Sequence, residues 1–365
     1  MQDAHEILNS FKDPLLAKAL VESIHSHAPK RPVSIMEVCG THTMSIARCG
    51  LRQLMPESVK LKSGPGCPVC VTSNADIDKM IALAGLDNTI ITTFGDMMRV
   101  PGSSKSLNDC AGAGSDIRIC YSPMDALKIA VDNQDKNVIF LGVGFETTAP
   151  LVALAIKHAK AMNIKNFFVY CAHKNMPNAL EVIVNDPEIS IDGLMLPGHV
   201  STIIGLQPYQ FLADKYSIPG VVTGFDPVDI LKSIDDLLAF IKSGQAGIKN
   251  DYSRGVNASG NIVAQNVIRE VFDICDATWR GIGEIKGSGF CIAPEYSDFD
   301  AMKHFTVEVE PLKEHAGCMC GEVLRSAIEP ECCKLFGTVC TPENPVGPCM
   351  VSSEGTCAAY FRYYR

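Results

Sequence analysis

From residue 32 to about residue 235, short apolar runs alternate with helical patterns, and this alternation constrains the fold more than any other feature. Each run ends in Gly, Pro or a polar cluster and is followed by apolar residues at helical spacing. Such a rhythm is typical of βα units on a mostly parallel sheet. We therefore predict an α/β fold with two tandem Rossmann-like parallel-sheet domains joined near residue 121. The expected strands are 33–38, 59–63, 88–94, 116–121, 137–145, 166–172, 191–197 and 220–225.

Two further regions flank these sheets. Apolar positions at helical spacing after Pro14 predict an amphipathic helix, and we expect it to pack on the C-terminal domain. Beyond residue 235 the pattern predicts helices at 235–243 and 261–278 and a strand at 305–311. The last region is expected to be a helical, cysteine-rich iron–sulfur domain. The predicted domains are 1–31, 32–121, 122–235 and 236–365.

Charge and hydropathy exclude several classes of protein. The net charge of −9 argues against a nucleic-acid binder, which needs a basic face for the phosphates. The N-terminus lacks the basic region and apolar core of a signal peptide, and no run of about 18 apolar residues could span a membrane. We expect a cytoplasmic protein without membrane or nucleic-acid partners. In the reducing cytosol, 16 cysteines favour metal or redox chemistry over a disulfide framework.

Seven of the cysteines fall in the last 48 residues, interleaved with Gly and Pro. Structural zinc sites usually use two short CxxC knuckles, and this tail has no such pair. The wide spacing favours an iron–sulfur cluster, although zinc and inert buried thiols remain alternatives. One choice of four ligands leaves gaps of 14, 6 and 16 residues, and the two cysteines left over could pair as a redox disulfide. The four are Cys318, Cys333, Cys340 and Cys357, and the pair is Cys320 and Cys349.

Two cysteine-containing loops follow neighbouring predicted strands. In CGTHT (39–43), Cys39 lies at a predicted helix start, where backbone N–H groups favour a thiolate. A buried structural cysteine is the alternative, as a satisfied structural histidine is for His42. In GPGCPVC (64–70), Cys67 and Cys70 have the spacing of a reversible disulfide. As half of a zinc site they would need a second pair, which this part of the sequence does not supply.

The segment GFETTAP (144–150) follows another predicted strand. It lacks the Lys-Ser/Thr ending of a phosphate loop and a complete GxGxxG pattern. Glu146 could act as an acid/base or a hydrogen-bond acceptor, or it could cap the following helix.

Taken together, CGTHT, GPGCPVC, GFETTAP, LPGHVS and the tail GCMCG…CCKLFGTVCTPENPVGPCMVSSEGTCAAY resemble the HypD family of [NiFe]-hydrogenase maturation proteins over essentially the whole chain. The resemblance implies a cytosolic monomer with two α/β domains and a [4Fe-4S] cluster. It also implies a scaffold formed with a small HypC-type chaperone, on which the transient Fe(CN)2CO iron group is assembled. Cyanide is expected from a HypE-type partner.

By matching motif, the resemblance assigns a role to most of these residues. Cys39 is the expected iron ligand, with His42 close to the iron, and Cys67 and Cys70 are the expected electron-relaying dithiol. No duty is assigned to Glu146, Thr147 and Thr148 of GFETT. The expected cluster ligands are Cys318, Cys333, Cys340 and Cys357, beside a disulfide between Cys320 and Cys349. Cys332 is an ambiguity, which we resolve for Cys333 because CKLFG is the matching motif.

The predicted function is therefore an assembly scaffold with a redox and cyanide-transfer role, rather than an enzyme with ordinary turnover. One rival is a cluster-dependent thiol oxidoreductase resembling ferredoxin:thioredoxin reductase, in which no iron is mounted on Cys39. The other is a zinc-stabilised binding module without redox chemistry.

Overall fold

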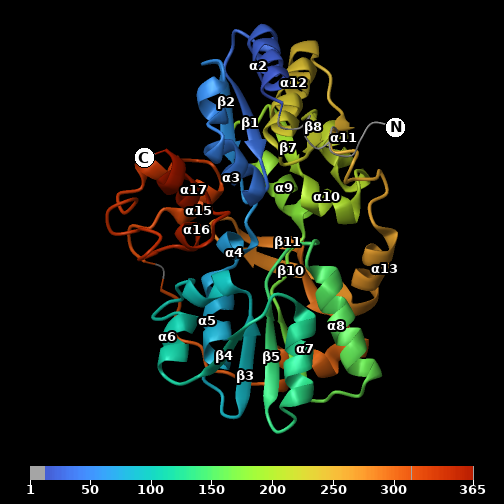
Figure 1. Ribbon diagram of the computed structural model, residues 1–365, viewed down its shortest axis with the longest axis vertical. Coiled ribbons are helices and arrows are strands. Elements are labelled where there is room, and N and C mark those ends of the chain that lie inside the picture. The colour runs from blue at the N-terminus through green and yellow to red at the C-terminus, as the bar shows by residue number, and fades with distance from the viewer. Residues whose placement is uncertain (1–12, 314, 365) are drawn as a thin grey trace.

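Two parallel sheets form the two ends of the protein. The computed structural model describes residues 13–313 and 315–364. In Figure 1 one sheet lies in the upper half and the other in the lower half, and we call them the upper and lower sheets. A two-stranded hairpin and the short helix α4 (Pro68–Val71) lie between them (Figure 1). The α/β class with two parallel sheets and a cysteine-rich C-terminal region is confirmed.

All eight predicted strands are present in the two sheets. The upper sheet has the order β2-β1-β7-β8-β9 and the lower sheet the order β4-β3-β5-β6, with every pairing parallel. The upper strands are β1 (Val33–Glu37), β2 (Val59–Ser63), β7 (Gly193–Pro197), β8 (Gly220–Thr223) and β9 (Ile248–Asn250). The lower strands are β3 (Thr89–Thr93), β4 (Asp116–Ile119), β5 (Asn137–Gly142) and β6 (Phe167–Cys171).

The strands are not divided between the sheets in the tandem order that we expected. The chain builds β1 and β2, leaves to build the whole lower sheet, and returns to place β7 beside β1. The predicted boundary near residue 121 therefore falls inside the lower sheet, between β4 and β5. The pattern of apolar residues identifies a buried strand but carries no information about its neighbours, and that is why the grouping into 32–121 and 122–235 was wrong.

Helices cover the faces of both sheets. Helix α2 (Pro14–His27) packs on α12 (Pro227–Ser243), where Asp235 accepts hydrogen bonds from Ser23 and contacts His27 at 2.7 Å. The predicted partner was the domain at 236–365, and α12 crosses its predicted boundary. Residues 1–12 of the predicted N-terminal range lie outside the described part. The other helices of the two halves are α3 (Gly40–Arg48), α5 (Asn74–Leu83), α6 (Leu107–Gly112), α7 (Pro123–Asp132), α8 (Ala149–Ala161), α9 (Met176–Val184), α10 (Gly198–Ile204), α11 (Gln210–Tyr216), α13 (Ile262–Val271) and α14 (Ala301–His304).

The hairpin corrects two predictions beyond residue 235. The predicted helix 261–278 ends at Val271, and the chain continues as β10 (Phe272–Trp279), which pairs with β11 (Gly283–Ile292). Aromatic and β-branched residues from Phe272 onward favour a strand, and Gly281 and Gly283 provide the positive φ angles of the turn. The predicted strand at 305–311 is absent, because no neighbouring strand pairs with it.

The cysteine-rich tail packs against the upper half. Its helices are α15 (Cys320–Leu324), α16 (Pro348–Val351) and α17 (Thr356–Tyr363), and the rest is turns. Helix α17 packs on α3, and α16 packs on α4. The tail thus touches both cysteine-containing loops of the upper sheet.

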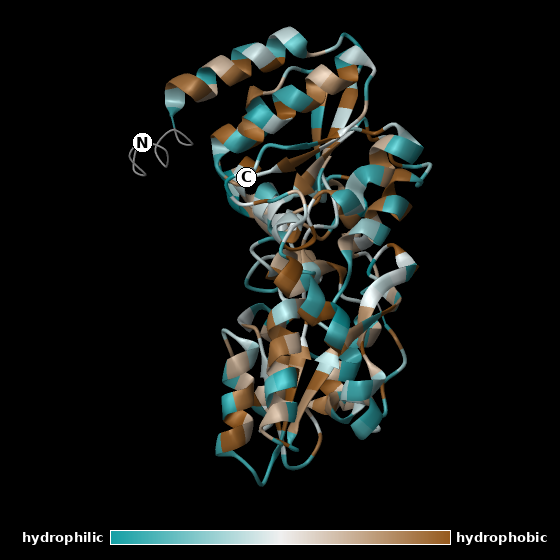
Figure 2. Ribbon diagram, turned by 90° about the vertical axis from the view of Figure 1, so that its right-hand side faces the viewer, coloured by the Kyte–Doolittle hydropathy of each residue, from teal (hydrophilic) through white to brown (hydrophobic). Residues whose placement is uncertain are grey.

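Hydropathy follows this arrangement. Figure 2 shows the strands mostly brown and the surface helices in alternating brown and teal, as expected for helices that bury one face. Among the described residues, no helix is long and apolar enough to cross a membrane.

Candidate functional site

The carboxyl ends of the upper strands meet at the edge that faces the lower sheet. Because β1 lies between β2 and β7, the loop after β1 has the CPVC loop on one side and the loops after β7 and β8 on the other. This is the edge at which ligands bind in open α/β sheets. We call it the upper edge, and Cys39 lies at its centre.

Two glycines let other segments approach Cys39 closely. The Gly40 N–H donates to the Gly66 carbonyl at 3.1 Å, and a Cβ on Gly66 would lie 2.4 Å from the Cys39 Cα. A Cβ on Gly40 would lie 2.4 Å from the Cβ of Glu354 in the cysteine-rich tail. The Thr41 hydroxyl also donates to a Glu354 carboxyl oxygen at 2.8 Å. Cys39 is therefore enclosed by the CPVC loop and by the tail.

Burial, and not the helix terminus, dominates the chemistry of Cys39. Its side chain is buried at the start of α3, and this burial raises the pKa of the thiol to about 12, with the negative charge of Glu354 adding to the effect. The backbone N–H groups of Thr41 and His42 favour the thiolate, as the sequence suggested, but they do not overcome the burial. The free thiol is thus protonated at neutral pH, and a bound cation would have to displace that proton.

Glu37 is a buried acid beside Cys39 that the sequence analysis missed. One carboxyl oxygen accepts the Cys39 N–H at 3.0 Å, and the other accepts the Thr43 hydroxyl. Burial raises the pKa of Glu37 to about 7. The sequence did contain a signal for Glu37, because it is a charged residue near the end of the apolar run VSIMEV. An acid in a buried strand needs hydrogen-bond partners.

His42 is buried and neutral. Its Nε2 lies 2.9 Å from the Gly224 carbonyl, so Nε2 carries the hydrogen and Nδ1 keeps a lone pair. Nδ1 has no hydrogen-bond partner among the described residues, and burial lowers the pKa of His42 to about 4. The ring stacks on Phe225, whose other face stacks on His199. His42 Nδ1 is thus a buried nitrogen with a free lone pair in the first turn of α3, the helix that Cys39 caps.

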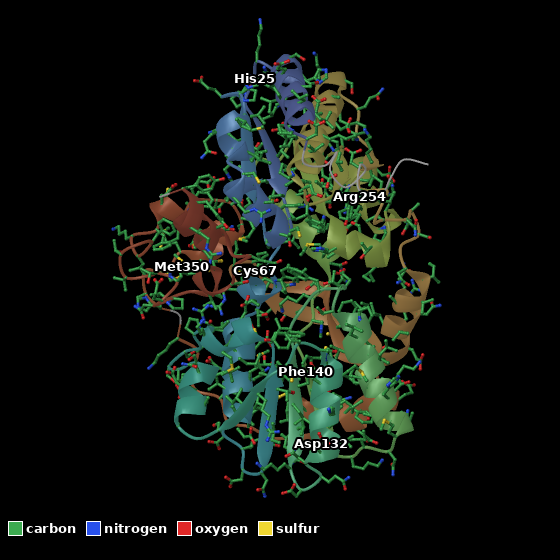
Figure 3. All side chains as sticks on the ribbon, in the orientation of Figure 1. His25, Cys67, Asp132, Phe140, Arg254 and Met350 are labelled. Atoms are coloured by element: carbon green, nitrogen blue, oxygen red, sulfur yellow. A yellow bond between two sulfur atoms is a disulfide. The ribbon has the colours of Figure 1, made fainter. Side chains whose placement is uncertain are left out.

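Cys67 and Cys70 form a disulfide at the start of α4. Cys70 Sγ contacts the Pro348 carbonyl at 3.8 Å, directly before Cys349 of α16. Figure 3 shows Cys67 at the middle of the molecule, near the segment that carries Met350. The CPVC loop therefore contacts both the Cys39 loop and the cysteine-rich tail.

Six of the seven tail cysteines line one cavity, together with Leu335, Phe336 and Met350. They are the six that were expected to bind a cluster or form the neighbouring disulfide. Cys333 lines it, whereas Cys332 does not and is exposed. No three His, Cys, Asp or Glu side chains in the described ranges are close enough to hold a single metal ion. A cluster spreads its ligand sulfurs over several metal atoms, so thiols around an apolar cavity fit a cluster better than one zinc ion. The six are Cys318, Cys320, Cys333, Cys340, Cys349 and Cys357.

The thiols of this cavity interact directly. Those of Cys318 and Cys349 hydrogen-bond to Cys320, which lowers the pKa of Cys320 and raises the pKa of both neighbours. Cys320 and Cys349 are free in the structure, so the disulfide expected between them stays a prediction. The pair lines the same cavity as the other four cysteines.

Glu146 belongs to the loop after β5 and thus to the carboxyl edge of the lower sheet, which we call the lower edge. One carboxyl oxygen accepts the Met176 N–H at 2.9 Å, the other has no partner among the described residues, and burial raises the pKa to about 7. Thr148 caps α8 and donates to the Phe145 carbonyl at 3.3 Å, while Thr147 precedes it in the same loop. The role of these three residues stays open.

Tyr209 shares an apolar core with Phe145 of the lower edge and Cys67 of the upper edge, and nothing in the sequence indicated it. It is fully buried, and its hydroxyl accepts a hydrogen bond from Ser201 at 3.3 Å. Burial raises its pKa, and the charges of Glu146 and Cys39 raise it further. Glu146 and Cys39 are therefore both close enough to Tyr209 to influence it.

Sequence comparisons match one protein family over almost the whole chain. The family described as "HypD: Hydrogenase formation hypA family" matches residues 15–364. The chain is 44% identical to the hydrogenase maturation factor HypD of Rhodobacter capsulatus, with 97% of each chain covered. It is 42% identical to the same factor of Cupriavidus necator and 41% identical to that of Escherichia coli, with 98% of this chain and 97% of each relative covered.

Proposed function

The chain belongs to the HypD family of hydrogenase maturation factors, and from this premise we propose that it is a scaffold and redox component for assembling the Fe(CN)2CO group of [NiFe]-hydrogenase. It would act in the cytoplasm, as a monomer that binds a small HypC-type chaperone and a HypE-type cyanide donor.

One observation supports this proposal most strongly, namely a continuous path of contacts between Cys39 and the cysteine cavity. The path runs from Cys39 to Gly66, through the adjacent Cys67–Cys70 disulfide, and on to Pro348 and the Cys349–Cys320 contact. Cys67, Cys70, Cys320 and Cys349 are also buried in the same apolar core. Electrons can move between groups that are packed together in this way without a diffusing carrier.

Cys39 holds the iron substrate in this proposal, together with a cysteine of the chaperone. Low-spin iron with cyanide and carbon monoxide ligands needs soft anionic donors, and thiolates supply them. The thiol loses its proton when iron binds, because the metal charge replaces the proton that burial retains. Glu37 and the N–H groups of Thr41 and His42 fix the loop that presents the sulfur.

The cysteine cavity fits a [4Fe-4S] cluster. Cys318, Cys333, Cys340 and Cys357 would hold it, and the cluster would supply one-electron chemistry. Cys320 and Cys349 lie against these ligands, on the side from which α16 reaches the CPVC pair. The dithiol formed from Cys67 and Cys70 then supports cyanide transfer at Cys39.

A thiol oxidoreductase is the second candidate, since a disulfide beside a cluster cavity would serve it equally well. That function gives no use to Cys39, which is enclosed by the CPVC loop and the tail. The two candidates therefore differ in what they predict for Cys39.

Replacement of Cys39 tests the scaffold. In cells that lack their own copy of this factor, we expect Cys39→Ser to reduce hydrogenase activity to background while the purified variant keeps its fold. The matched control is Cys49→Ser, a half-buried cysteine at the other end of α3. Normal hydrogenase activity with Cys39→Ser would favour the thiol oxidoreductase.

The neighbouring pair Cys332 and Cys333 tests the cluster. After anaerobic purification, we expect Cys333→Ser to lose most iron, sulfide and visible absorption, and Cys332→Ser to retain them, because only Cys333 lines the cavity. Zinc in the wild-type protein, without iron or sulfide, would show that the cavity is a zinc site.

A further inference from the structure

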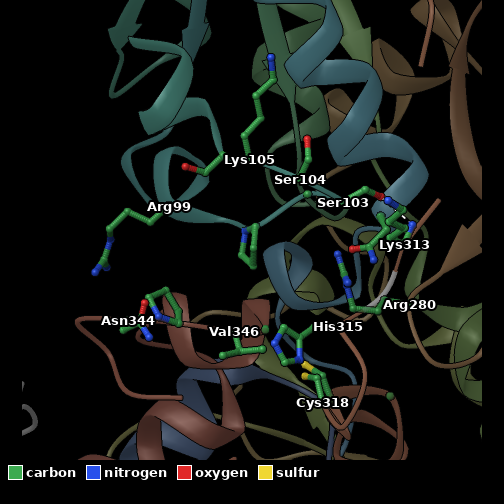
Figure 4. A pocket seen from close by; sticks show the side chains of 18 of the residues that line it. Arg99, Ser103, Ser104, Lys105, Arg280, Lys313, His315, Cys318, Asn344 and Val346 are labelled. Carbon is green, nitrogen blue, oxygen red and sulfur yellow. Dashed lines mark hydrogen bonds between the residues drawn. The ribbon is translucent and has the colours of Figure 1, made fainter. Parts of the chain in front are cut away.

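A second, larger cavity lies outside the cysteine cavity and shares a wall with it. Its volume is about 750 Å³, and it is lined by the loop before α6, the hairpin tip at Arg280 and Gly281, and two stretches of the cysteine-rich tail. Figure 4 shows it from close by. Cys318 and Cys320 line both cavities.

The shared wall is thin because Gly347 has no side chain. A Cβ at this position would lie 2.8 Å from Cys318 Sγ and 3.4 Å from Cys320 Sγ. Any larger residue would press on these sulfurs or move them. The outer cavity therefore leads directly to two of the thiols that line the proposed cluster site.

The lining of the outer cavity holds five cationic and three acidic side chains, although the whole chain carries a net charge of −9. Four of these five cations form no ion pair within residues 13–313 and 315–364. Arg325, also in the lining, is paired with Asp186 and Glu188. The four unpaired cations are Arg99, Lys105, Arg280 and Lys313, opposed by Asp109, Glu322 and Glu343 of the same lining.

The rim is held in place by hydrogen bonds. Ser103 donates its N–H and hydroxyl to Asp78, at 2.7 and 2.6 Å, and accepts the Lys313 N–H at 2.9 Å. Arg280 donates its N–H to the Val71 carbonyl and its Nε to the Thr72 carbonyl. Arg280 thus joins the outer cavity to the segment that follows the CPVC pair.

The cations are spread around the cavity and do not converge. Figure 4 shows Arg99, Lys105 and Lys313 on three different sides, with Arg280 nearer to Cys318. A small anion could contact one or two of them, whereas a protein with an acidic surface could face them all. Complementary charge on such a rim accelerates encounter and orients the partner.

We propose that this cavity is the docking site of an acidic electron-transfer protein, which delivers electrons at the wall formed by Cys318, Cys320 and Gly347. The inference rests on the proposed function, because it names the electron donor for the same relay. Each reduced carrier gives up one electron, so two carriers and two protons convert the Cys67–Cys70 disulfide into two thiols. The S–S bond breaks, and each sulfur gains a proton.

The test uses the full-length protein and an acidic plant-type ferredoxin as the probe. Lys105 and Lys313 are exposed, so the Lys105→Glu/Lys313→Glu variant reverses two rim charges without disturbing the core. The control, Lys18→Glu/Lys165→Glu, makes the same change in net charge at exposed positions on α2 and before β6. Binding is measured by calorimetry at low ionic strength, and reduction of the disulfide by alkylation and mass spectrometry.

We expect the rim variant to bind ferredoxin about tenfold more weakly than the wild type, the control to bind within about twofold, and salt to weaken the wild-type complex. Equal binding by the rim variant and the wild type, or equal weakening in the control, would overturn the docking site. The docking site would also be overturned if the rim variant slowed disulfide reduction by dithionite as much as reduction by ferredoxin. The cavity would then select small anions and not a protein.

The two readouts separate this inference from the proposed function. Charge-dependent binding without formation of new thiols would overturn the electron relay and leave the docking site standing. Thiol formation that does not depend on the rim charges would support the relay and overturn the docking site.

Discussion

The upper and lower edges contain the same kinds of buried group, yet among the described residues only the upper edge adjoins a disulfide. Each edge has a carboxyl group with a pKa raised to about 7 by burial, Glu37 above and Glu146 below. Each also has a buried histidine whose pKa is lowered by burial, to about 4 for His42 and about 3 for His173. Titration behaviour therefore does not distinguish the edges.

The cysteines of the two edges differ in what surrounds them. Cys171 at the end of β6 has a pKa raised to about 12, like Cys39, and donates to the Phe290 carbonyl at 3.2 Å. No disulfide adjoins it in the described part of the chain, whereas Cys39 touches the loop of the Cys67–Cys70 disulfide. A raised thiol pKa thus reports burial at both edges, and only the contacts of the two thiols differ.

The largest expected effect is a loss of hydrogenase maturation when a cysteine of the upper edge is replaced. Replacing a cysteine of the lower edge should cause little loss. We expect Cys67→Ser to abolish hydrogenase maturation, because a single thiol cannot form the disulfide. Cys171→Ser should keep most of the activity, since the serine hydroxyl can also donate to the Phe290 carbonyl. Hydrogenase activity in cells without their own copy measures both, and equal losses would remove the distinction between the edges.

A glycine of each edge tests how tightly its loop is packed. A Cβ at Gly66 would lie 2.3 Å from the Cys39 backbone nitrogen, so we expect Gly66→Ala to lower the free energy of unfolding by about 3 kcal/mol. At Gly144 the nearest atom is the Thr148 hydroxyl, which can rotate away, and about 1 kcal/mol is expected.

The control for both glycines is Gly112→Ala at the end of α6, where a Cβ would meet nothing within 4 Å. Its stability should change by no more than about 0.5 kcal/mol. Denaturant unfolding measures all three variants, and similar values for Gly66 and Gly144 would contradict the closer packing of the upper edge.

A smaller effect should appear in the pH dependence of stability. The Glu146 pKa is raised from 4.5 to about 7, so the folded protein binds more protons than the unfolded chain between these values. Stability from this group is fully present below pH 4.5 and is lost as the pH rises through 7. Between pH 5 and pH 8 the loss is roughly 2 kcal/mol.

Glu146→Gln removes this titrating carboxyl group. The free energy of unfolding of the variant should therefore fall by roughly 2 kcal/mol less than that of the wild type over the same pH range. The slope is the readout, because the amide changes absolute stability as well. Glu37 is present in both proteins, and its similar titration cancels in the difference. Parallel curves for the two proteins would contradict a raised pKa for Glu146.

The local parts of the fold were accessible from the sequence. The apolar runs located eight strands, and glycine and proline located the CPVC turn. Strand pairing was not accessible, because β1 joins β7 only after more than a hundred intervening residues have formed another sheet. The hairpin was missed at Val271, where the helical spacing of α13 runs on into an alternating strand pattern.

The residues of the site that lie in short motifs could be predicted from the sequence, and those from distant segments could not. Short motifs identified Cys39 and the CPVC pair because their neighbours are close in sequence. Glu354, Arg280 and Tyr209 were missed because tertiary packing brings them to the site from distant segments. The pKa of Cys39 was misjudged for the same reason, since the sequence shows the helix start but not the layers that bury it.

The central claim is that Cys39 holds the iron group, and infrared absorption tests it most directly. The protein would be purified anaerobically together with its small chaperone partner, as the wild type and as Cys39→Ser. We expect cyanide and carbonyl stretching bands in the wild-type complex and none in the variant. Bands that persist in Cys39→Ser would contradict the claim, as would a wild-type complex that contains iron but shows no such bands.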